Sequence, residues 1–109
     1  MIQVVNKKTY KGDGVYIGRP SPLGNIFSHL SVSLAQHRTQ SRDEAIEKYR
    51  NWLREQLKTD NAVSREFKNL VKFYRDFGEL TLVCWCVPKK CHGEVIRDFI
   101  NEWIEKGYS

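Results

Sequence analysis

Apolar residues recur along the chain with two different periods, and these periods predict where helices and strands lie. Three segments carry apolar residues at helical spacings of three and four positions: 41–57, 61–77 and 92–106. Three other segments are short runs rich in β-branched residues, which are typical of strands: 2–6, 15–17 and 80–86. The predicted order is two strands, two helices, a strand and a helix.

The ends of the predicted helices carry capping signals. Ser41 followed by Glu44 fits a capping box, Asp60 or Asn61 opens the second helix, and Gly78 is a natural terminator after it. The side chains expected to face the core are Ala45, Ile46, Tyr49, Trp52, Leu53 and Leu57 in the first helix, Val63, Phe67, Leu70, Val71 and Tyr74 in the second, and Val95, Ile96, Phe99, Ile100, Trp103 and Ile104 in the third.

The strands differ in their expected surroundings. Glycines within 11–14 supply turn chemistry between the first two strands, which are expected to pair, with an antiparallel arrangement as one option. The run 80–86 is continuously apolar, which is typical of a strand buried on both faces of a parallel sheet. Together the elements predict an α/β fold, a small three-layer Rossmann-like domain with a short, mainly parallel sheet and three helices. We expect a single domain over 1–109, with the Ser-rich stretch 28–40 as a variable loop insert.

Composition excludes several classes of protein. The chain has 109 residues, too few for a barrel enzyme or a full dinucleotide-binding fold, and its 40% hydrophobic content is that of a folded domain. No apolar run is long enough to span a membrane and the first residues lack a signal peptide, so we expect a cytoplasmic protein without a membrane partner. Lys and Arg number 18 against 13 Asp and Glu, and the net charge of +5 favours anionic partners.

Two segments are unusual enough to suggest chemistry: the Pro- and Gly-rich loop 18–27 and the Cys-rich segment 84–93. If the strands before them are parallel neighbours joined by the two-helix crossover, both segments emerge at the carboxyl ends of strands. Open α/β sheets bind ligands at that edge. We therefore expect the two segments to converge on one electropositive crevice.

The residue types in these segments suit an anion. Backbone N–H groups that open a helix attract anions, a glycine there lets a phosphate approach closely, and an arginine fork binds phosphate or carboxylate. Short polar side chains and tight glycine turns complete such a site, and Lys89 and Lys90 raise its positive potential. The residues predicted to bind the ligand are Gly18, Arg19, Ser21, Gly24, Asn25, Cys91, His92 and Gly93.

Several of these residues also have a purely structural explanation. Arg19 would equally pair with a surface carboxylate, Asn25 would cap backbone amides, and the glycines and prolines would form only a turn. Cys84 and Cys86 alternate on a buried strand, where free cysteine is a common core residue.

Cys91 and His92 are the candidate catalytic residues. A thiol in the first turn of a helix, beside a histidine and two lysines, is expected to have a lowered pKa, which suits a nucleophile, a redox-sensitive thiol or a polar lining group. A histidine adjacent in sequence usually points away from such a thiol. Cys84, Cys86, Cys91 and His92 supply four soft ligands, but their spacing is not that of structural zinc. We expect no metal and no cofactor.

Three blocks of the chain resemble a known family, domain of unknown function family 4326, which occurs in bacteria and often in phages. The blocks are Val15-Tyr-Ile-Gly-Arg-Pro-Ser-Pro-Leu-Gly-Asn-Ile-Phe27, Ser41-Arg-Asp-Glu-Ala-Ile-Glu-Lys-Tyr-Arg-Asn-Trp-Leu53 and Cys84-Trp-Cys-Val-Pro-Lys-Lys-Cys-His-Gly-Glu-Val-Ile96. The chain departs from the family at Ile26, where members tend to have proline, and in 28–40, which is longer than usual. The family's name implies no activity. A looser likeness to another uncharacterised family, in which Cys-His-Arg after a strand opens a helix, implies a Rossmann-like fold with a ligand crevice.

Three functions are compatible with these observations. The first is binding of a phosphorylated, nucleotide-like small molecule at the strand carboxyl ends, for example by a phage-encoded protein that sequesters a nucleotide signal. The alternative is a nucleotide-processing enzyme, a hydrolase or glycosidase-like protein, that uses Cys91 or His92. The second alternative is a nucleic-acid-binding module, suggested by charge alone because the basic residues are spread along the chain. Formation of a homo-oligomer and chemical conversion of the ligand are both compatible with the sequence.

Overall fold

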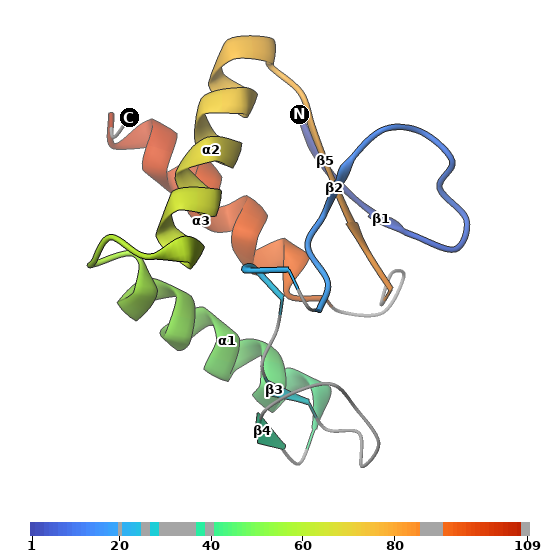
Figure 1. Cartoon of the computed structure of the whole chain (residues 1–109), viewed down its shortest axis with the longest axis vertical. Helices are drawn as coiled ribbons and strands as arrows, with labels where there is room; N and C mark the ends of the chain where they lie inside the picture. The colour runs from blue at the N-terminus through green and yellow to red at the C-terminus, as the bar shows by residue number, and fades with distance from the viewer. Residues whose placement is uncertain (20, 25–26, 29–36, 39–40, 86–90, 108–109) are drawn as a thin grey trace.

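The computed structural model describes residues 1–19, 21–24, 27–28, 37–38, 41–85 and 91–107. Its elements, in chain order, are β1 (Ile2–Asn6), β2 (Val15–Tyr16), β3 (Phe27–Ser28), β4 (His37–Arg38), α1 (Arg42–Gln56), α2 (Ala62–Phe77), β5 (Leu80–Cys84) and α3 (Gly93–Glu105). Three of the strands form a parallel sheet in the order β1-β5-β2, and β3 and β4 form a separate parallel pair (Figure 1). The predicted α/β class, with three helices and a short parallel sheet, is confirmed.

The two N-terminal strands do not neighbour each other, so the expected pairing of these strands is wrong. The central strand β5 separates them, because Leu82 lies opposite Val4 of β1 on one side and Val15 of β2 on the other. β2 pairs only with the later part of β5, so the connection 7–14 runs back along part of β1 before β2 begins. Eight extended residues can span roughly 26 Å, which is ample for that return without a helix.

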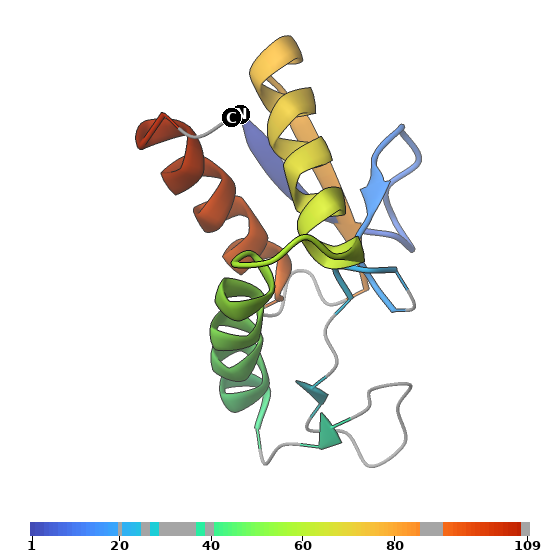
Figure 2. The ribbon, with the colours of Figure 1, turned by 60° about the vertical axis from the view of Figure 1, so that its left-hand side comes forward.

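All three helices lie on one side of the sheet in both views (Figures 1 and 2). α2 packs on β5, α3 packs on β1 and β5, and α1 contacts both of the other helices. The described residues therefore form two layers where three were expected. The reason is that the connection 7–14, between β1 and β2, contains no helix to cover the other face.

The apolar faces predicted for the helices are confirmed. Every predicted core side chain of α1, α2 and α3 is buried or packs against the buried core. The fully buried side chains that fill this core include Ile17, Leu23, Tyr49, Leu53, Phe67, Leu82, Val95, Ile96 and Ile100. The turn after β2 thus contributes to the same core as the helices.

Local capping explains where α1 and α2 begin and end. The Ser41 hydroxyl accepts a hydrogen bond from the Glu44 N–H at 3.1 Å, which is the N-cap half of the predicted capping box. Asn61 and Ser64 form a full capping box at the start of α2, each side chain accepting from the other residue's N–H at 2.8–2.9 Å. Gly78 ends α2 with a left-handed backbone (φ 75°), a conformation that glycine adopts at little cost.

The predicted strand 80–86 is shorter than expected. β5 ends at Cys84, opposite Asn6, the last residue of β1. Four of its five residues are buried, but the next residue, Trp85, is 56% exposed because it lies beyond the end of the β1 ladder. Cys86 lies outside the described residues.

Two further predictions, the insert 28–40 and the absence of a membrane span, can be compared only with the described residues. Within 28–40, the structure describes Ser28 and the strand His37–Arg38, and the rest of the predicted insert lies outside the described residues. Among the described residues, no helix is long and apolar enough to cross a membrane.

Candidate functional site

The two segments that the sequence singled out meet at one edge of the sheet. β2 and β5 are parallel neighbours, so the turn after β2 and the segment after β5 both leave from strand carboxyl ends. The Nε2 atom of His92, just before α3, lies 2.7 Å from the carbonyl oxygen of Ile17, just after β2. The two segments are therefore in direct contact at the buried end of the sheet.

His92 is held in a defined orientation. A carbonyl oxygen only accepts hydrogen bonds, so Nε2 carries the proton that it donates to Ile17. The other ring nitrogen, Nδ1, lies 3.5 Å from the Cys91 sulfur, and the ring meets that of Tyr49 edge-on with centroids 5.0 Å apart. The expectation that this imidazole points away from Cys91 is wrong, because the Ile17 carbonyl turns the ring back over the start of the helix.

Cys91 is a buried residue, only 2% exposed. Its sulfur lies 2.8 Å from the sulfur of Cys84 and accepts the N–H of Gly93 at 3.4 Å. Both cysteines are free thiols, and the structural explanation given for Cys84 is confirmed by its burial in the core. The described residues contain no group of three or more His, Cys, Asp or Glu that could hold a metal ion.

The start of α3 already holds an anionic group from its own chain. The Cys91 N–H donates to a carboxylate oxygen of Glu94 at 3.2 Å, and the Glu94 N–H donates back to the Cys91 carbonyl at 3.1 Å. Helix N-terminal amides attract any nearby anion, and here the side chain of Glu94 takes that position. A ligand contact by the backbone of Cys91, His92 and Gly93 therefore stays a prediction.

Gly93 lets α3 approach the sheet closely. A Cβ atom at this position would lie 2.8 Å from Val4 Cγ1 and 3.0 Å from Ile17 Cδ1. Gly93 is itself buried, so this close packing explains the residue without a phosphate. The sequence could not separate these two explanations, because both require the same small residue.

The turn after β2 is described at residues 18–19 and 21–24, which form no strand or helix but are held by backbone hydrogen bonds. The Ser21 N–H donates to the Gly18 carbonyl at 2.8 Å and the Gly24 N–H to the Ser21 carbonyl at 2.9 Å. Gly24 folds back so far that a Cβ there would lie 3.0 Å from both N and Cα of Arg19. Those are backbone atoms that cannot swing away, so a larger residue here would force the turn to shift, and glycine is favoured at this position.

Three side chains from outside the turn hold carbonyl groups within it or just before it. His92 donates to Ile17, the Tyr16 hydroxyl donates to the Arg19 carbonyl at 2.8 Å, and the Tyr49 hydroxyl of α1 donates to the Leu23 carbonyl at 2.6 Å. These donors come from β2, α1 and the start of α3, so three parts of the fold fix the turn in place. We call residues 18–19 and 21–24, held in this way, the clamped turn.

The sequence missed the clamping tyrosines. The sequence predicts Tyr49 only as a core side chain of its helix, and in the structure it is fully buried. Burial is the main reason that its pKa is raised well above the usual value, with the nearby Cys91 as a second cause, so the hydroxyl remains a donor to Leu23. The sequence contains one signal for this role. Tyr49 lies on the predicted buried face of its helix, and a buried hydroxyl usually has a hydrogen-bond partner.

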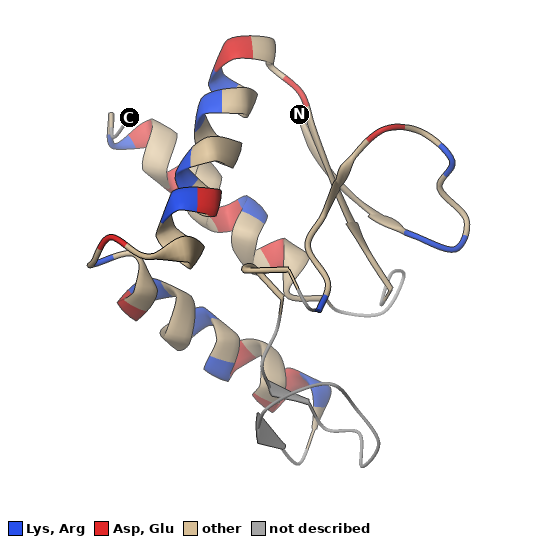
Figure 3. Cartoon of the chain, viewed as in Figure 1, with Lys and Arg blue, Asp and Glu red and all other residues tan. Residues whose placement is uncertain are grey.

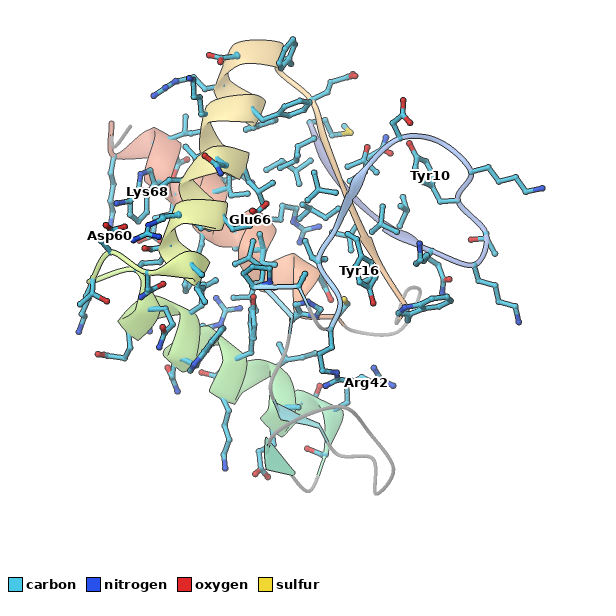
Figure 4. All side chains as sticks on the ribbon, viewed as in Figure 1. Tyr10, Tyr16, Arg42, Asp60, Glu66 and Lys68 are labelled. Atoms are coloured by element: carbon cyan, nitrogen blue, oxygen red, sulfur yellow. The ribbon has the colours of Figure 1, made fainter. Side chains whose placement is uncertain are left out.

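Two polar side chains of the clamped turn, Arg19 and Ser21, are described by the structure. Arg19 is partly buried and Ser21 carries a buried hydroxyl oxygen for which the described part of the chain provides no hydrogen-bond partner. Basic residues stand on the connection after β1, on the clamped turn and at the start of α1 (Figure 3). Figure 4 labels Arg42 at that helix start and Tyr16 at the sheet edge. Asn25 lies outside the described residues, as do Lys89 and Lys90.

An aromatic pair borders the clamped turn. The indole N–H of Trp85 donates to the Tyr16 hydroxyl at 3.1 Å, and the ammonium group of Lys7 lies 5.4 Å from the centre of the Tyr16 ring. Trp85 is not among the residues predicted to bind the ligand, because the continuously apolar run 80–86 predicts a buried strand that includes it.

A separate hollow of about 300 Å³ lies between the carboxyl-terminal parts of α1 and α3. Its lining is Arg54, Leu57, Lys58, Phe99, Glu102, Trp103 and Lys106. The cations there are already engaged: Lys106 pairs with Glu102, Lys58 with Glu55, and Arg54 stacks over Phe99. None of these lining residues belongs to the clamped turn or to the start of α3.

Comparison with known proteins places the chain in a family. No curated protein and no solved structure matches it. A family model described as Domain of unknown function (DUF4326) matches residues 2–102. This match spans nearly the whole chain and includes the clamped turn and the start of α3, so the protein belongs to the DUF4326 family, as its three sequence blocks predicted.

Proposed function

We propose that this protein binds a phosphorylated, nucleotide-like small molecule at the carboxyl edge of the sheet, in the cytoplasm. The observation that carries the proposal is the clamped turn, in which His92, Tyr16 and Tyr49 hold three successive parts of an irregular segment. A loop fixed before binding loses little conformational freedom when a ligand arrives. Such a loop supports recognition of a small ligand better than a mobile surface loop does.

The charge of this edge supports an anionic ligand. Arg19 belongs to the clamped turn, and its planar guanidinium can donate two parallel hydrogen bonds to a phosphate. Lys7 and Arg42 add positive charge from neighbouring elements (Figure 3). Because Glu94 occupies the start of α3, we assign the phosphate to the Arg19 side of the edge.

The role that we propose is binding, for example sequestration of a nucleotide signal by a phage-encoded protein. Cys91 and His92 are 2% and 6% exposed, which supports a part in positioning the clamped turn. Binding of nucleic acid stays a weaker prediction, since it has only the net charge of +5 in its favour.

Binding to defined phosphates tests the proposal. Titration calorimetry and thermal shift would use adenosine 5′-monophosphate, ribose 5-phosphate and ADP-ribose with the wild-type protein, Arg19→Ala and Arg75→Ala. Arg75 is an exposed arginine at the end of α2 and gives the same change of charge away from the site. We expect Arg19→Ala to weaken binding about tenfold or more, and Arg75→Ala to leave it unchanged. Absence of stabilisation by every phosphorylated compound would refute the proposal.

One contact favours a second candidate, a nucleotide-processing enzyme. Nδ1 of His92 lies 3.5 Å from the Cys91 sulfur, a distance at which an imidazole can assist a thiol nucleophile. This candidate requires the pair to become accessible, because both side chains are buried. Mass spectrometry of each compound after long incubation with the protein separates the candidates: recovery of the unaltered compound rejects the enzyme for that compound.

A further inference from the structure

Trp85 is an exposed aromatic side chain at the edge where we place the ligand. It is 56% exposed, although it directly follows a strand whose residues are all buried or half-buried. The other exposed large apolar side chains of the described residues are Met1 at the chain terminus and Phe73 and Phe77 on α2. An exposed indole at this particular edge therefore calls for a physical explanation.

Trp85 is held in position by two strands. Its indole Nε1–H donates to the hydroxyl of Tyr16, at the end of β2, at 3.1 Å. Its backbone carbonyl accepts a hydrogen bond from the side-chain amide of Asn6, at the end of β1, at 3.2 Å. Because the indole N–H and the backbone carbonyl are both hydrogen-bonded, the side chain has only its apolar ring surface to offer to a partner.

The same tyrosine connects Trp85 to the clamped turn. The Tyr16 hydroxyl, which accepts from Trp85, donates its own proton to the carbonyl of Arg19 at 2.8 Å. The ring of Tyr16 also carries the ammonium group of Lys7 at 5.4 Å from its centre. A single residue, Tyr16, thus connects the exposed indole by hydrogen bonds to the arginine to which we assign the phosphate.

We propose that Trp85 is the surface on which the base of a bound nucleotide stacks. This inference rests on the proposed function and narrows it: the ligand class is a nucleotide with an aromatic base, rather than a sugar phosphate alone. Indole rings stack well on every nucleobase, because each base presents a π-face. Since Tyr16 and Asn6 already fix Trp85, stacking costs little side-chain entropy.

A pair of ligands that differ only in the base tests this inference. Adenosine 5′-monophosphate and ribose 5-phosphate share the sugar and the phosphate, so the ratio of their dissociation constants reports the contribution of the base. Titration calorimetry would give this ratio for the wild-type protein, Trp85→Ala, Trp85→Phe and Phe77→Ala. Phe77 is 69% exposed on α2 and is the matched control for loss of an exposed aromatic ring.

The expected result is a base contribution that depends on Trp85. In the wild-type protein the nucleotide binds about 5- to 150-fold more tightly than ribose 5-phosphate. Trp85→Ala removes this preference, Trp85→Phe keeps part of it, and Phe77→Ala keeps all of it.

The contrary results separate this inference from the proposed function. Equal binding of the two compounds by the wild-type protein, or a preference that survives Trp85→Ala, overturns the stacking role while leaving the phosphate site in place. Binding of neither compound overturns the proposed function, and the stacking role with it. Because Trp85 is exposed, its variants are expected to fold, and an unchanged circular dichroism spectrum checks this.

Discussion

The imidazole of His92 links the two segments of the candidate site, with Nε2 2.7 Å from the Ile17 carbonyl oxygen. This hydrogen bond joins residues 75 positions apart in the chain and is buried. Its partner Ile17 directly precedes the clamped turn, so the bond fixes where that turn begins. The position of Arg19 thus depends on a residue at the far end of the sequence.

Loss of this hydrogen bond should destabilise the protein. His92→Phe keeps an aromatic ring but leaves the buried Ile17 carbonyl without its donor, which is expected to lower the free energy of unfolding by about 1–3 kcal/mol. Urea denaturation measures this change. His92→Gln, whose amide can place a donor near the same carbonyl, is expected to lose less. Equal stability of His92→Phe and the wild-type protein would mean that the bond contributes nothing.

Gly93 and Val4 should show coupled effects on stability. A Cβ at position 93 would lie 2.8 Å from Val4 Cγ1, so Gly93→Ala is expected to cost about 1–3 kcal/mol through overpacking. Val4→Ala removes the clashing methyl groups. The double variant Gly93→Ala/Val4→Ala should therefore be more stable than the sum of the two single effects predicts, by about 0.5 kcal/mol or more. Strict additivity in urea denaturation would show that α3 moves away from the sheet instead.

The helices and their buried faces were predictable because their signals are local. Each helix carries apolar residues at a constant spacing, and Ser41 and Gly78 act on backbone groups within one turn of their own positions. The parallel pairing of β2 and β5 was also predictable, since two intervening helices provide the crossover that parallel strands need.

The clamped turn depends on contacts between residues far apart in the chain, which no local sequence pattern predicts. The Tyr49 hydroxyl reaches the Leu23 carbonyl across 26 positions, and Glu94 captures an amide that the sequence assigned to a ligand. The exposure of Trp85 depends on where β1 ends, opposite Cys84, which is a property of strand register. The composition of the two segments therefore predicts the location of the candidate site, but not which of its side chains face outward.

Tyr49 should make stability fall at alkaline pH. Burial raises its pKa in the folded protein, whereas in the unfolded chain the hydroxyl ionises near its usual pKa of about 10. Between these two pKa values the unfolded state binds fewer protons than the folded state, so the free energy of unfolding decreases as pH rises, by up to about 1.4 kcal/mol per pH unit. The stabilisation is fully present below about pH 10 and is lost above it.

Comparison with Tyr49→Phe isolates this effect, because phenylalanine keeps the ring and cannot ionise. At pH 8 the variant is expected to be less stable by about 0.5–1.5 kcal/mol, since it lacks the hydrogen bond to Leu23. Urea denaturation from pH 8 to pH 11 should show this difference shrinking above about pH 10. A difference that stays constant over the whole range would contradict the raised pKa of Tyr49.

The thiols of Cys84 and Cys91 should be protected in the folded protein. They are 1% and 2% exposed, so a reagent such as iodoacetamide reaches them only when the structure opens. We expect both to be labelled at least about a hundredfold more slowly in buffer than in denaturant. Trypsin cleaves after Lys89 and Lys90, which separates Cys91 from the peptide that carries Cys84 and Cys86, and fragmentation of that peptide assigns the label to Cys84.

A thiol placed on the surface provides the control for this measurement. Asn101 is exposed on α3, the helix that Cys91 precedes, and Asn101→Cys should be labelled in buffer nearly as fast as in denaturant. Fast labelling of Cys91 in the folded protein would contradict its burial and would favour the enzyme over the binding protein, because a nucleophile must reach its substrate. Slow labelling of Cys91 beside fast labelling at position 101 would support a Cys91–His92 pair that holds the turn in place.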